Sequence, residues 1–216
     1  MKFLLTYSFI FFLTTNIVFS QSTNNWPDFR GPNHNGITSA KGLPDTWGET
    51  ENVVWKTAIH DKGWSTPVIW DNQIWMTTAT EKGHELFAVC VDFQTGKVLH
   101  DIKVFDVETP QKKHSENSYA TPSAAIEAGK VYVHYGTEGT ACINTKSGKI
   151  LWTRTDLRCD HMQGSASSPF IFENMLILHI EGTDVQYVIA LEKTTGKTIW
   201  KTDRPADLYQ GPPVYR

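Results

Sequence analysis

The chain has 216 residues, of which 40% are hydrophobic and 20% are charged, and its formal net charge at pH 7 is −3. These values predict a globular protein that is large enough to bury a substantial core. The charges are spread along the sequence without a basic stripe, which excludes nucleic acid and an anionic membrane surface as expected partners.

The N-terminus predicts export. Met1 and Lys2 are followed by an apolar run over residues 3–19, and polar sequence resumes at Gln21. A short apolar run after a basic start is typical of a signal peptide, here residues 1–20 with cleavage near Ser20. No other stretch is long enough to cross a bilayer, so we expect a periplasmic or secreted protein without a transmembrane segment.

Residues 21–52 predict an extended arm. The segment is rich in aromatic residues, proline and glycine, and Trp26 to Pro32 reads WPDFRGP. Such a segment is ordered only when its rings pack against another surface, so we expect it to lie across the folded body. Residues 53–59 then alternate between polar and apolar side chains, which predicts an orphan outer strand without a sheet of its own.

From residue 64 onward, one pattern of about 50 residues occurs three times. Each copy ends in a turn, and the three turns read CVDFQTGKVLH, CINTKSGKILW and ALEKTTGKTIW. Their glycines are 52 and 48 residues apart: Gly96, Gly148 and Gly196. A small residue followed by proline stands 29, 26 and 27 residues before these glycines, at Pro67, Pro122 and Pro169. Two landmarks that keep register over three copies establish a repeat.

Each repeat predicts four short antiparallel strands joined by tight turns, and no stretch shows helical periodicity. The expected strands are 66–70, 73–80, 85–92 and 98–105, then 120–126, 130–136, 140–144 and 149–155, then 167–172, 175–181, 185–192 and 197–202. The predicted fold is therefore all-β, a β-propeller with blades at residues 64–105, 117–155 and 165–203. Residues 204–216 are expected to begin a linker to a further blade.

The composition of the turns suits contact between blades. Glycine supplies the positive φ that a tight hairpin requires. The aromatic ring four residues later, Trp152 or Trp200, falls on the outer strand, where it can cover the neighbouring sheet. The first repeat has His100 at this place, so we expect weaker packing there. The predicted blade-docking residues are Gly96, Gly148, Trp152, Gly196 and Trp200.

The motif Ala-x-Asp-x-x-Thr-Gly-x-x-x-Trp resembles that of the PQQ-like, or quinoprotein alcohol dehydrogenase-like, β-propeller repeats. The resemblance covers residues 26–204 and is strongest to exported members that begin with Trp-Pro-x-Phe-Arg-Gly-Pro. The family includes quinoprotein alcohol dehydrogenases and the propeller lipoprotein of bacterial outer-membrane assembly. Its rings usually have about eight blades. The resemblance thus implies further blades of the same chain, of which these residues are the N-terminal part. In a closed ring, the orphan strand would complete the last blade.

The cysteines fit this repeat. Cys90 and Cys142 occupy the place of Ala190 in the third copy, which predicts unpaired, buried thiols that act as small core side chains. Cys159 lies in a loop instead, and we expect it to be either reactive or paired with a group outside this chain.

A group of histidines gives the candidate site. His60, His114 and His161 stand 7, 8 and 8 residues before the three repeat prolines, in loops that should surround the mouth of the propeller axis. Either these side chains converge to bind a ligand or to act as acid and base, or each imidazole caps its own loop. The ligand-binding candidates are His60, Trp64, His114, Asn117, Tyr119, His161 and Gln163, with His114 and His161 as the catalytic candidates.

The sequence favours binding over catalysis. It has no Cys-Cys pair, no haem attachment motif and no spacing typical of a metal site, so no cofactor is assured and PQQ with calcium stays an alternative. The first hypothesis is an exported binding or scaffold module for a protein or glycan partner. The alternative is an enzyme with an axial pocket, either a PQQ-dependent dehydrogenase or a carbohydrate-active enzyme.

Overall fold

The computed structural model describes residues 25–204. The predicted signal peptide, the first residues of the arm and the predicted linker after residue 204 lie outside the described residues. Within residues 25–204, no helix has the length and hydropathy that a membrane span requires.

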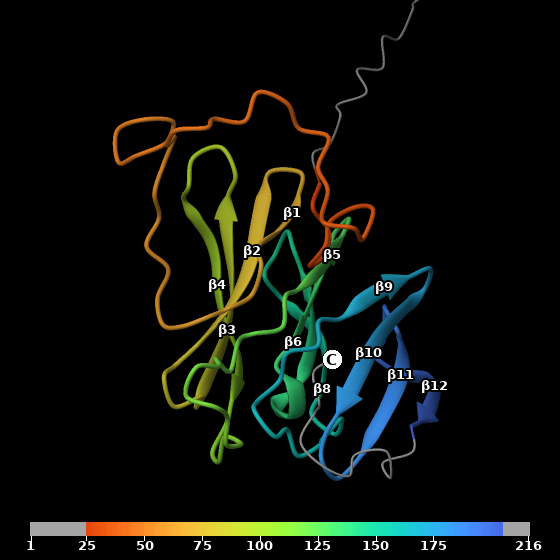
Figure 1. The fold of residues 1–216 in the computed structure, drawn as a ribbon. Coiled ribbons are helices and arrows are strands. Elements are labelled where there is room, and N and C mark those ends of the chain that lie inside the picture. Colours follow the sequence, from red (N-terminus) through yellow and green to blue (C-terminus); the bar gives the residue numbers. More distant parts are fainter. Residues whose placement is uncertain (1–24, 205–216) are drawn as a thin grey trace, which may run out of the picture.

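The described chain forms three four-stranded antiparallel sheets, each in the order of its strands along the sequence (Figure 1). The first sheet contains β1 (Val68–Trp70), β2 (Gln73–Ala79), β3 (Glu85–Asp92) and β4 (Val98–Asp106). The second contains β5 (Ala125–Glu127), β6 (Lys130–His134), β7 (Thr140–Asn144) and β8 (Ile150–Arg154), with a short 3-10 turn, η1 (Gly136–Glu138), between β6 and β7. The third contains β9 (Phe170–Phe172), β10 (Met175–Glu181), β11 (Gln186–Glu192) and β12 (Thr198–Asp203).

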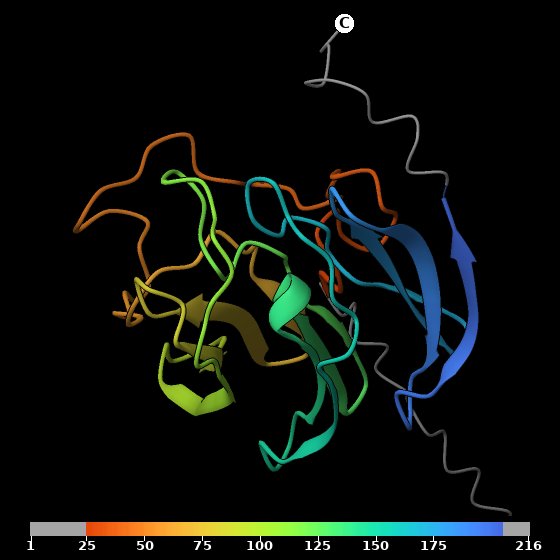
Figure 2. The same cartoon turned by 90° about the horizontal axis from the view of Figure 1, so that it is seen from below.

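The sheets stand side by side in an arc (Figure 2), as consecutive blades of a propeller do. The prediction of an all-β propeller of four-stranded blades is confirmed. We refer to the sheets as blades 1, 2 and 3, and to the first strand of each, β1, β5 and β9, as the inner strands.

The core lies between the faces of neighbouring blades. Side chains on successive strand residues point to opposite faces, and β6 shows the result. Val131 and Val133 belong to the apolar cluster shared with blade 1, whereas Tyr132 between them belongs to the cluster shared with blade 3. The side chains of β6 are therefore directed alternately toward the two neighbouring blades.

The three cysteines are free thiols in the interior. Cys90 packs between blades 1 and 2 and Cys142 between blades 2 and 3. Burial raises the pKa of both thiols to about 12. Both side chains therefore stay protonated and act as apolar core groups.

The turn before each outer strand is built by one acidic or amide side chain. In blade 1, Asp92 Oδ1 accepts hydrogen bonds from Gln94 N, Thr95 N and Thr95 Oγ1 at 3.1, 2.7 and 2.7 Å. Asn144 Oδ1 accepts the equivalent three bonds in blade 2. The turn glycines Gly96, Gly148 and Gly196 have φ of +71°, +69° and +71°, which L side chains rarely adopt.

The inner strands are shorter than the sequence predicts. They begin at Val68, Ala125 and Phe170 instead of residues 66, 120 and 167. Proline has no amide hydrogen for a ladder, and the residues beside the prolines bond to the next blade instead: Thr66 N donates to Ser123 Oγ at 2.8 Å, and Ser123 N donates to Ser168 Oγ at 3.0 Å.

Two further differences concern β6 and the orphan strand. β6 ends at His134 and not at residue 136, because Gly136 has φ of +64° and starts η1. Residues 53–59 run along the outside of blade 1 (Figure 1) but pair with no strand of residues 25–204. Their contact with blade 1 is made by side chains: Trp55 Nε1 donates to Phe93 O at 3.0 Å, and Thr57 Oγ1 donates to Gly96 O at 2.5 Å.

Candidate functional site

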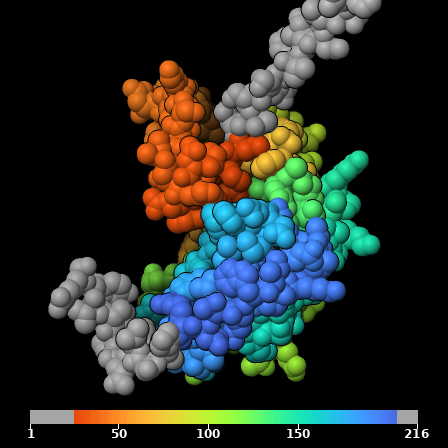
Figure 3. Space-filling view, turned by 90° about the vertical axis from the view of Figure 1, so that its right-hand side faces the viewer, coloured from red at the N-terminus to blue at the C-terminus, as the bar shows by residue number. Residues whose placement is uncertain are grey.

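The N-terminal arm crosses the inner strands of all three blades. Trp26 pairs with Ile69 of β1 through two backbone hydrogen bonds of 2.9 and 2.8 Å. Pro27 O accepts a hydrogen bond of 2.8 Å from Ile126 N of β5. The His34 ring meets Phe170 of β9 edge-on, with 4.8 Å between ring centroids, and Figure 3 shows the orange arm next to the light-blue start of blade 3.

A compact turn holds the arm in this position. The nearly buried Asp28 carboxylate accepts a hydrogen bond from Arg30 N at 3.0 Å, and its other oxygen lies 2.7 Å from His34 Nδ1. Gly31 has φ of +75°, and a Cβ on it would lie 2.8 Å from the Trp26 ring. The WPDFRGP sequence therefore forms a latch in which the chain folds back over its own tryptophan.

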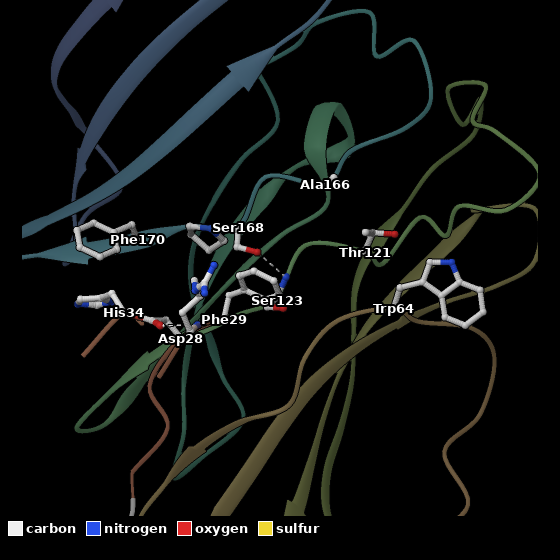
Figure 4. Close-up of a pocket in the computed structure, with 11 residues that line it drawn as sticks. Asp28, Phe29, His34, Trp64, Thr121, Ser123, Ala166, Ser168 and Phe170 are labelled. Carbon is white, nitrogen blue, oxygen red and sulfur yellow. Dashed lines mark hydrogen bonds and ion pairs between the residues drawn. The ribbon is translucent and has the colours of Figure 1, made fainter. Parts of the chain in front are cut away.

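The arm and the inner strands enclose an open cavity of about 560 Å³ (Figure 4). Aromatic and other apolar side chains form most of its wall, and hydroxyl groups, one guanidinium, one carboxylate and one imidazole complete it. The lining residues are Asp28, Phe29, Arg30, His34, Trp64, Thr121, Ser123, Ala166, Ser168, Pro169 and Phe170. We call this cavity the axial pocket, because the inner strands of a propeller face its axis.

The polar groups of the axial pocket are mainly hydrogen-bond donors. The hydroxyl oxygens of Ser123 and Ser168 each accept an amide hydrogen, and neither hydroxyl hydrogen has an acceptor among the described residues. Arg30 makes one long side-chain hydrogen bond, from Nη2 to Asn35 O at 3.4 Å. Asp28 is already engaged by the latch. The pocket therefore suits a ligand with an apolar group and hydrogen-bond acceptors.

Three of the predicted loop residues, His114, Asn117 and Gln163, form a cluster beside this pocket. Gln163 O accepts hydrogen bonds from His114 N at 3.2 Å and from Asn117 Nδ2 at 2.8 Å. Trp64 Nε1 donates to Glu116 O at 2.9 Å, which fixes the indole while 57% of Trp64 stays exposed. Of the predicted ligand-binding residues, Trp64 alone lines the axial pocket.

His60, His114 and His161 do not converge, so the expectation of three imidazoles at one mouth is wrong. His60 Nε2 lies 3.0 Å from Asp101 Oδ1 of β4, and its ring meets Phe87 of β3 edge-on. The chain reaches blade 1 from the outside, along residues 53–59, which places His60 against the outer half of the blade. His114 caps its own loop, because its Nδ1 accepts a hydrogen bond of 3.2 Å from Glu116 N.

His161 points into the protein. Its Nδ1 lies 3.2 Å from Glu181 O, and since a carbonyl can only accept, Nδ1 carries the proton. Nε2 then faces the Cys159 thiol at 3.4 Å. Burial lowers the pKa of His161 and raises that of Cys159 to about 11. The pair is therefore a neutral imidazole and a neutral thiol, which is not an activated nucleophile.

Tyr119 has a packing role. Its ring covers Gly83, where a Cβ would lie 2.6 Å away, and Lys113 Nζ lies 5.3 Å from the ring centroid on a cation–π contact. Burial raises the pKa of its hydroxyl. The loop cluster thus serves mainly to fix the loops between blades.

The chain matches a known family over more than half of its length. The model of the PQQ_2 family, described as outer membrane protein assembly factor BamB, matches residues 89–214. The chain belongs to the PQQ_2 family. No curated protein matches it closely enough to count as a relative.

One solved structure shows the same fold as this PQQ_2 chain, and a second one is similar to it. The quinohemoprotein alcohol dehydrogenase ADHIIG from Pseudomonas putida HK5 is 19% identical with a TM-score of 0.50, over 69% of this chain and 22% of that one. BamB from Moraxella catarrhalis is 18% identical with a TM-score of 0.49, over 70% of this chain and 40% of that one. The chain thus spans less than half the length of these proteins.

The sequence left PQQ with calcium as an alternative cofactor, and the described residues allow the calcium part to be tested. A calcium site needs several oxygen ligands at one place. Within residues 25–204, no three His, Cys, Asp or Glu side chains form a group that could hold a metal ion. Asp28, the single acidic side chain among the described lining residues, is bonded to Arg30 and His34. The described residues do not form a calcium site, and we derive no chemistry from the cofactor.

Sequence reasoning missed most of the axial pocket in this PQQ_2 chain. Phe29, Arg30 and Phe170 were not candidates, although the segment from Trp26 to Pro32 and the repeat prolines were both recognised. The repeat prolines offered one signal for the pocket. Each of Pro122 and Pro169 has a serine beside it, and these serines, Ser123 and Ser168, line the pocket.

Proposed function

We propose that the chain is part of an exported scaffold protein that binds a polypeptide partner in the axial pocket. The family description, an assembly factor for outer membrane proteins, supports a protein partner. The apolar run of residues 3–19 supports export to the periplasm. The observation that carries the proposal is the pocket itself, which is large, open and aromatic.

Three exposed rings give this pocket the character of an interface. Phe29, Trp64 and Phe170 are 55%, 57% and 37% exposed. Tryptophan and other aromatic side chains contribute much of the binding energy where proteins meet, and grouped exposed apolar side chains are typical of interaction sites. An apolar side chain of the partner would fill the pocket, and its backbone carbonyls would accept from the Ser123 and Ser168 hydroxyls.

The acid–base side chains that line the pocket, Asp28 and His34, are paired with each other in the latch, with 2.7 Å between His34 Nδ1 and Asp28 Oδ2. General acid–base catalysis needs a titratable group within hydrogen-bond reach of the reacting atoms. Neither of the two catalytic candidates, His114 and His161, lines the pocket. Each is bonded to backbone outside it, His114 to Glu116 N and His161 to Glu181 O of β10. The geometry therefore favours binding over the dehydrogenase and carbohydrate-active alternatives.

The test uses fluorescently labelled synthetic peptides that span the strands of a β-barrel outer membrane protein, with anisotropy as the readout. We expect Trp64→Ala to weaken binding about tenfold, as the loss of a central aromatic contact does. Trp47→Ala is the matched control, because Trp47 is a 72% exposed ring of the arm that does not line the pocket.

Equal affinity of the wild type and Trp64→Ala would contradict the proposal, and so would equal losses in both variants. Tighter binding of an oligosaccharide or of PQQ with calcium than of any peptide would support the alternatives instead.

A further inference from the structure

Arg30 lines the axial pocket from a fixed point of the backbone. Its amide nitrogen donates to Asp28 Oδ1 at 3.0 Å, and its carbonyl oxygen accepts from Gly36 N at 2.9 Å. The guanidinium lies beside the same turn, with Nη2 3.7 Å from the place that a Cβ on Gly36 would occupy. The N-terminal arm therefore holds both the backbone and the guanidinium of Arg30 in position.

The guanidinium of Arg30 has no anionic partner within residues 25–204. Its one side-chain hydrogen bond goes to a neutral acceptor, Asn35 O, at 3.4 Å from Nη2. Asp28, the single acidic residue among the described lining residues, directs its two carboxylate oxygens to Arg30 N and to His34 Nδ1. A guanidinium has five N–H donors and a permanent positive charge. Most of these donors are therefore free, and no contact neutralises the charge.

A partner that fills the axial pocket has to compensate this cation. While the pocket is open, water solvates the guanidinium of Arg30, but a bound polypeptide displaces that water. Removing water from a charge without pairing it is strongly unfavourable. The backbone carbonyls of the partner, which the hydroxyls of Ser123 and Ser168 can bind, are neutral and do not offset this cost. The pocket therefore favours a partner that brings a negative charge.

A carboxylate supplies what the guanidinium lacks. Its two oxygens match two parallel N–H groups of an arginine, and hydrogen bonds that involve charged groups are about twice as strong as neutral ones. The rings of Phe29 and Phe170 line the same cavity, and Figure 4 shows Ser123 and Ser168 between Phe170 and Trp64. The pocket thus offers a place for an apolar side chain together with a carboxylate.

We propose that the axial pocket selects a polypeptide segment in which a carboxylate lies next to an apolar residue, and that Arg30 binds this carboxylate. The inference rests on the proposed function and adds to it the chemistry of the segment that is bound. A partner has two sources of a carboxylate, the side chains of Asp and Glu and the C-terminus. Both present the same two oxygens to Arg30, so the test has to separate them.

The test uses anisotropy to compare the labelled peptide that binds best with variants that each lack one carboxylate. One set of variants replaces each Asp of the peptide by Asn and each Glu by Gln, one at a time, and a further variant ends in a carboxamide. We expect one of these changes to weaken binding to the wild-type chain about tenfold, as the loss of a hydrogen bond to a charged group does. The change that has this effect identifies the source of the carboxylate.

Arg30→Gln separates the guanidinium from the rest of the pocket. It should bind the unmodified peptide about tenfold more weakly than the wild type does, and it should bind the peptide without the critical carboxylate as well as the wild type does. Added salt should weaken the binding of the unmodified peptide to the wild type more than to Arg30→Gln. Arg158→Gln is the matched control and should behave as the wild type, because Arg158 is exposed and does not line the pocket.

Equal affinity of all peptide variants for the wild-type chain would overturn the inference. So would a loss in Arg30→Gln that is the same with and without the critical carboxylate. In both cases, binding that still depends on Trp64 would leave the proposed function in place. Absence of binding by every peptide would overturn both.

Discussion

The turn glycines allow neighbouring blades to approach closely. At Gly196, a substitution would have two separate costs, one from backbone strain and one from a steric clash. Its φ of +71° disfavours a side chain, and a Cβ would also collide with Trp152 at 2.8 Å. Gly129, in the hairpin between β5 and β6, has φ of +80° but nothing within 4 Å of a Cβ. The two positions share the backbone strain and differ in the contact.

We therefore expect Gly129→Ala to lower the free energy of unfolding by about 1 kcal/mol, the penalty of a left-handed backbone. Gly196→Ala should lower it by roughly 1–3 kcal/mol more, because the added methyl group overpacks the blade interface. Urea unfolding of both variants measures the difference. Equal losses would show that the ring of Trp152 moves aside without penalty.

His60 makes one part of the stability depend on pH. Hydrogen bonds to Asp61 and then to Asp101 raise its pKa above the ordinary value of 6.5. The protonated form therefore favours the folded chain, and this stabilisation is complete below about pH 6.5. It is lost as the pH rises through the higher pKa of the folded chain.

Asp101→Asn should bring the pKa of His60 back toward 6.5, since it removes one of the two carboxylates. An NMR titration of the His60 ring protons measures the pKa directly. Asp106→Asn is the control, because Asp106 pairs with Lys103 and not with His60. An unchanged pKa in Asp101→Asn would contradict the assigned partners.

At the scale of elements, the arm depends on its latch. Asp28 is the acceptor for Arg30 N and His34 Nδ1, so Asp28→Ala leaves the partly buried amide hydrogen of Arg30 without this partner. We expect a loss of about 1–3 kcal/mol in the stability of the latch, as for other broken hydrogen bonds to charged groups.

Amide hydrogen exchange locates this effect. Exchange at residues 26–36 should become faster in Asp28→Ala while the amides of β6 and β10 stay protected. Asp45→Ala, at an exposed position of the same arm, should change nothing. Uniform loss of protection across all three blades would show that the arm is part of the global folding unit instead.

The bounds of some strands can be predicted from the sequence and those of others cannot. β3, β7 and β10 have the predicted bounds, because turn residues stand on both sides of these middle strands. The inner strands do not, since Ser123 and Ser168 take up amide hydrogens that a ladder would otherwise use. The serine that accepts each amide hydrogen belongs to the next blade. The local sequence of an inner strand therefore cannot show that this hydrogen is taken.

At the scale of the molecule, the repeat predicts the blades, but not the pocket between them. Asp28 and Phe170 line one cavity although more than a hundred residues separate them in the sequence. The three loop histidines do not meet at one place for a related reason. The histidines have nearly equal spacing before the repeat prolines, which predicts equivalent backbone positions in the three blades. The direction of each side chain depends instead on the hydrogen bonds that it makes in its own surroundings.

The central claim is that the axial pocket binds the partner. The most direct test is an NMR titration of the isotope-labelled chain with the peptide that binds best, followed at the indole Nε1–H of Trp64 and at the amides of Ser123, Ser168 and Phe170. The account predicts that these signals shift together while the indole signal of Trp47 stays in place. Shifts confined to the loops of His114, His161 and Gln163, with none in the axial pocket, would contradict it.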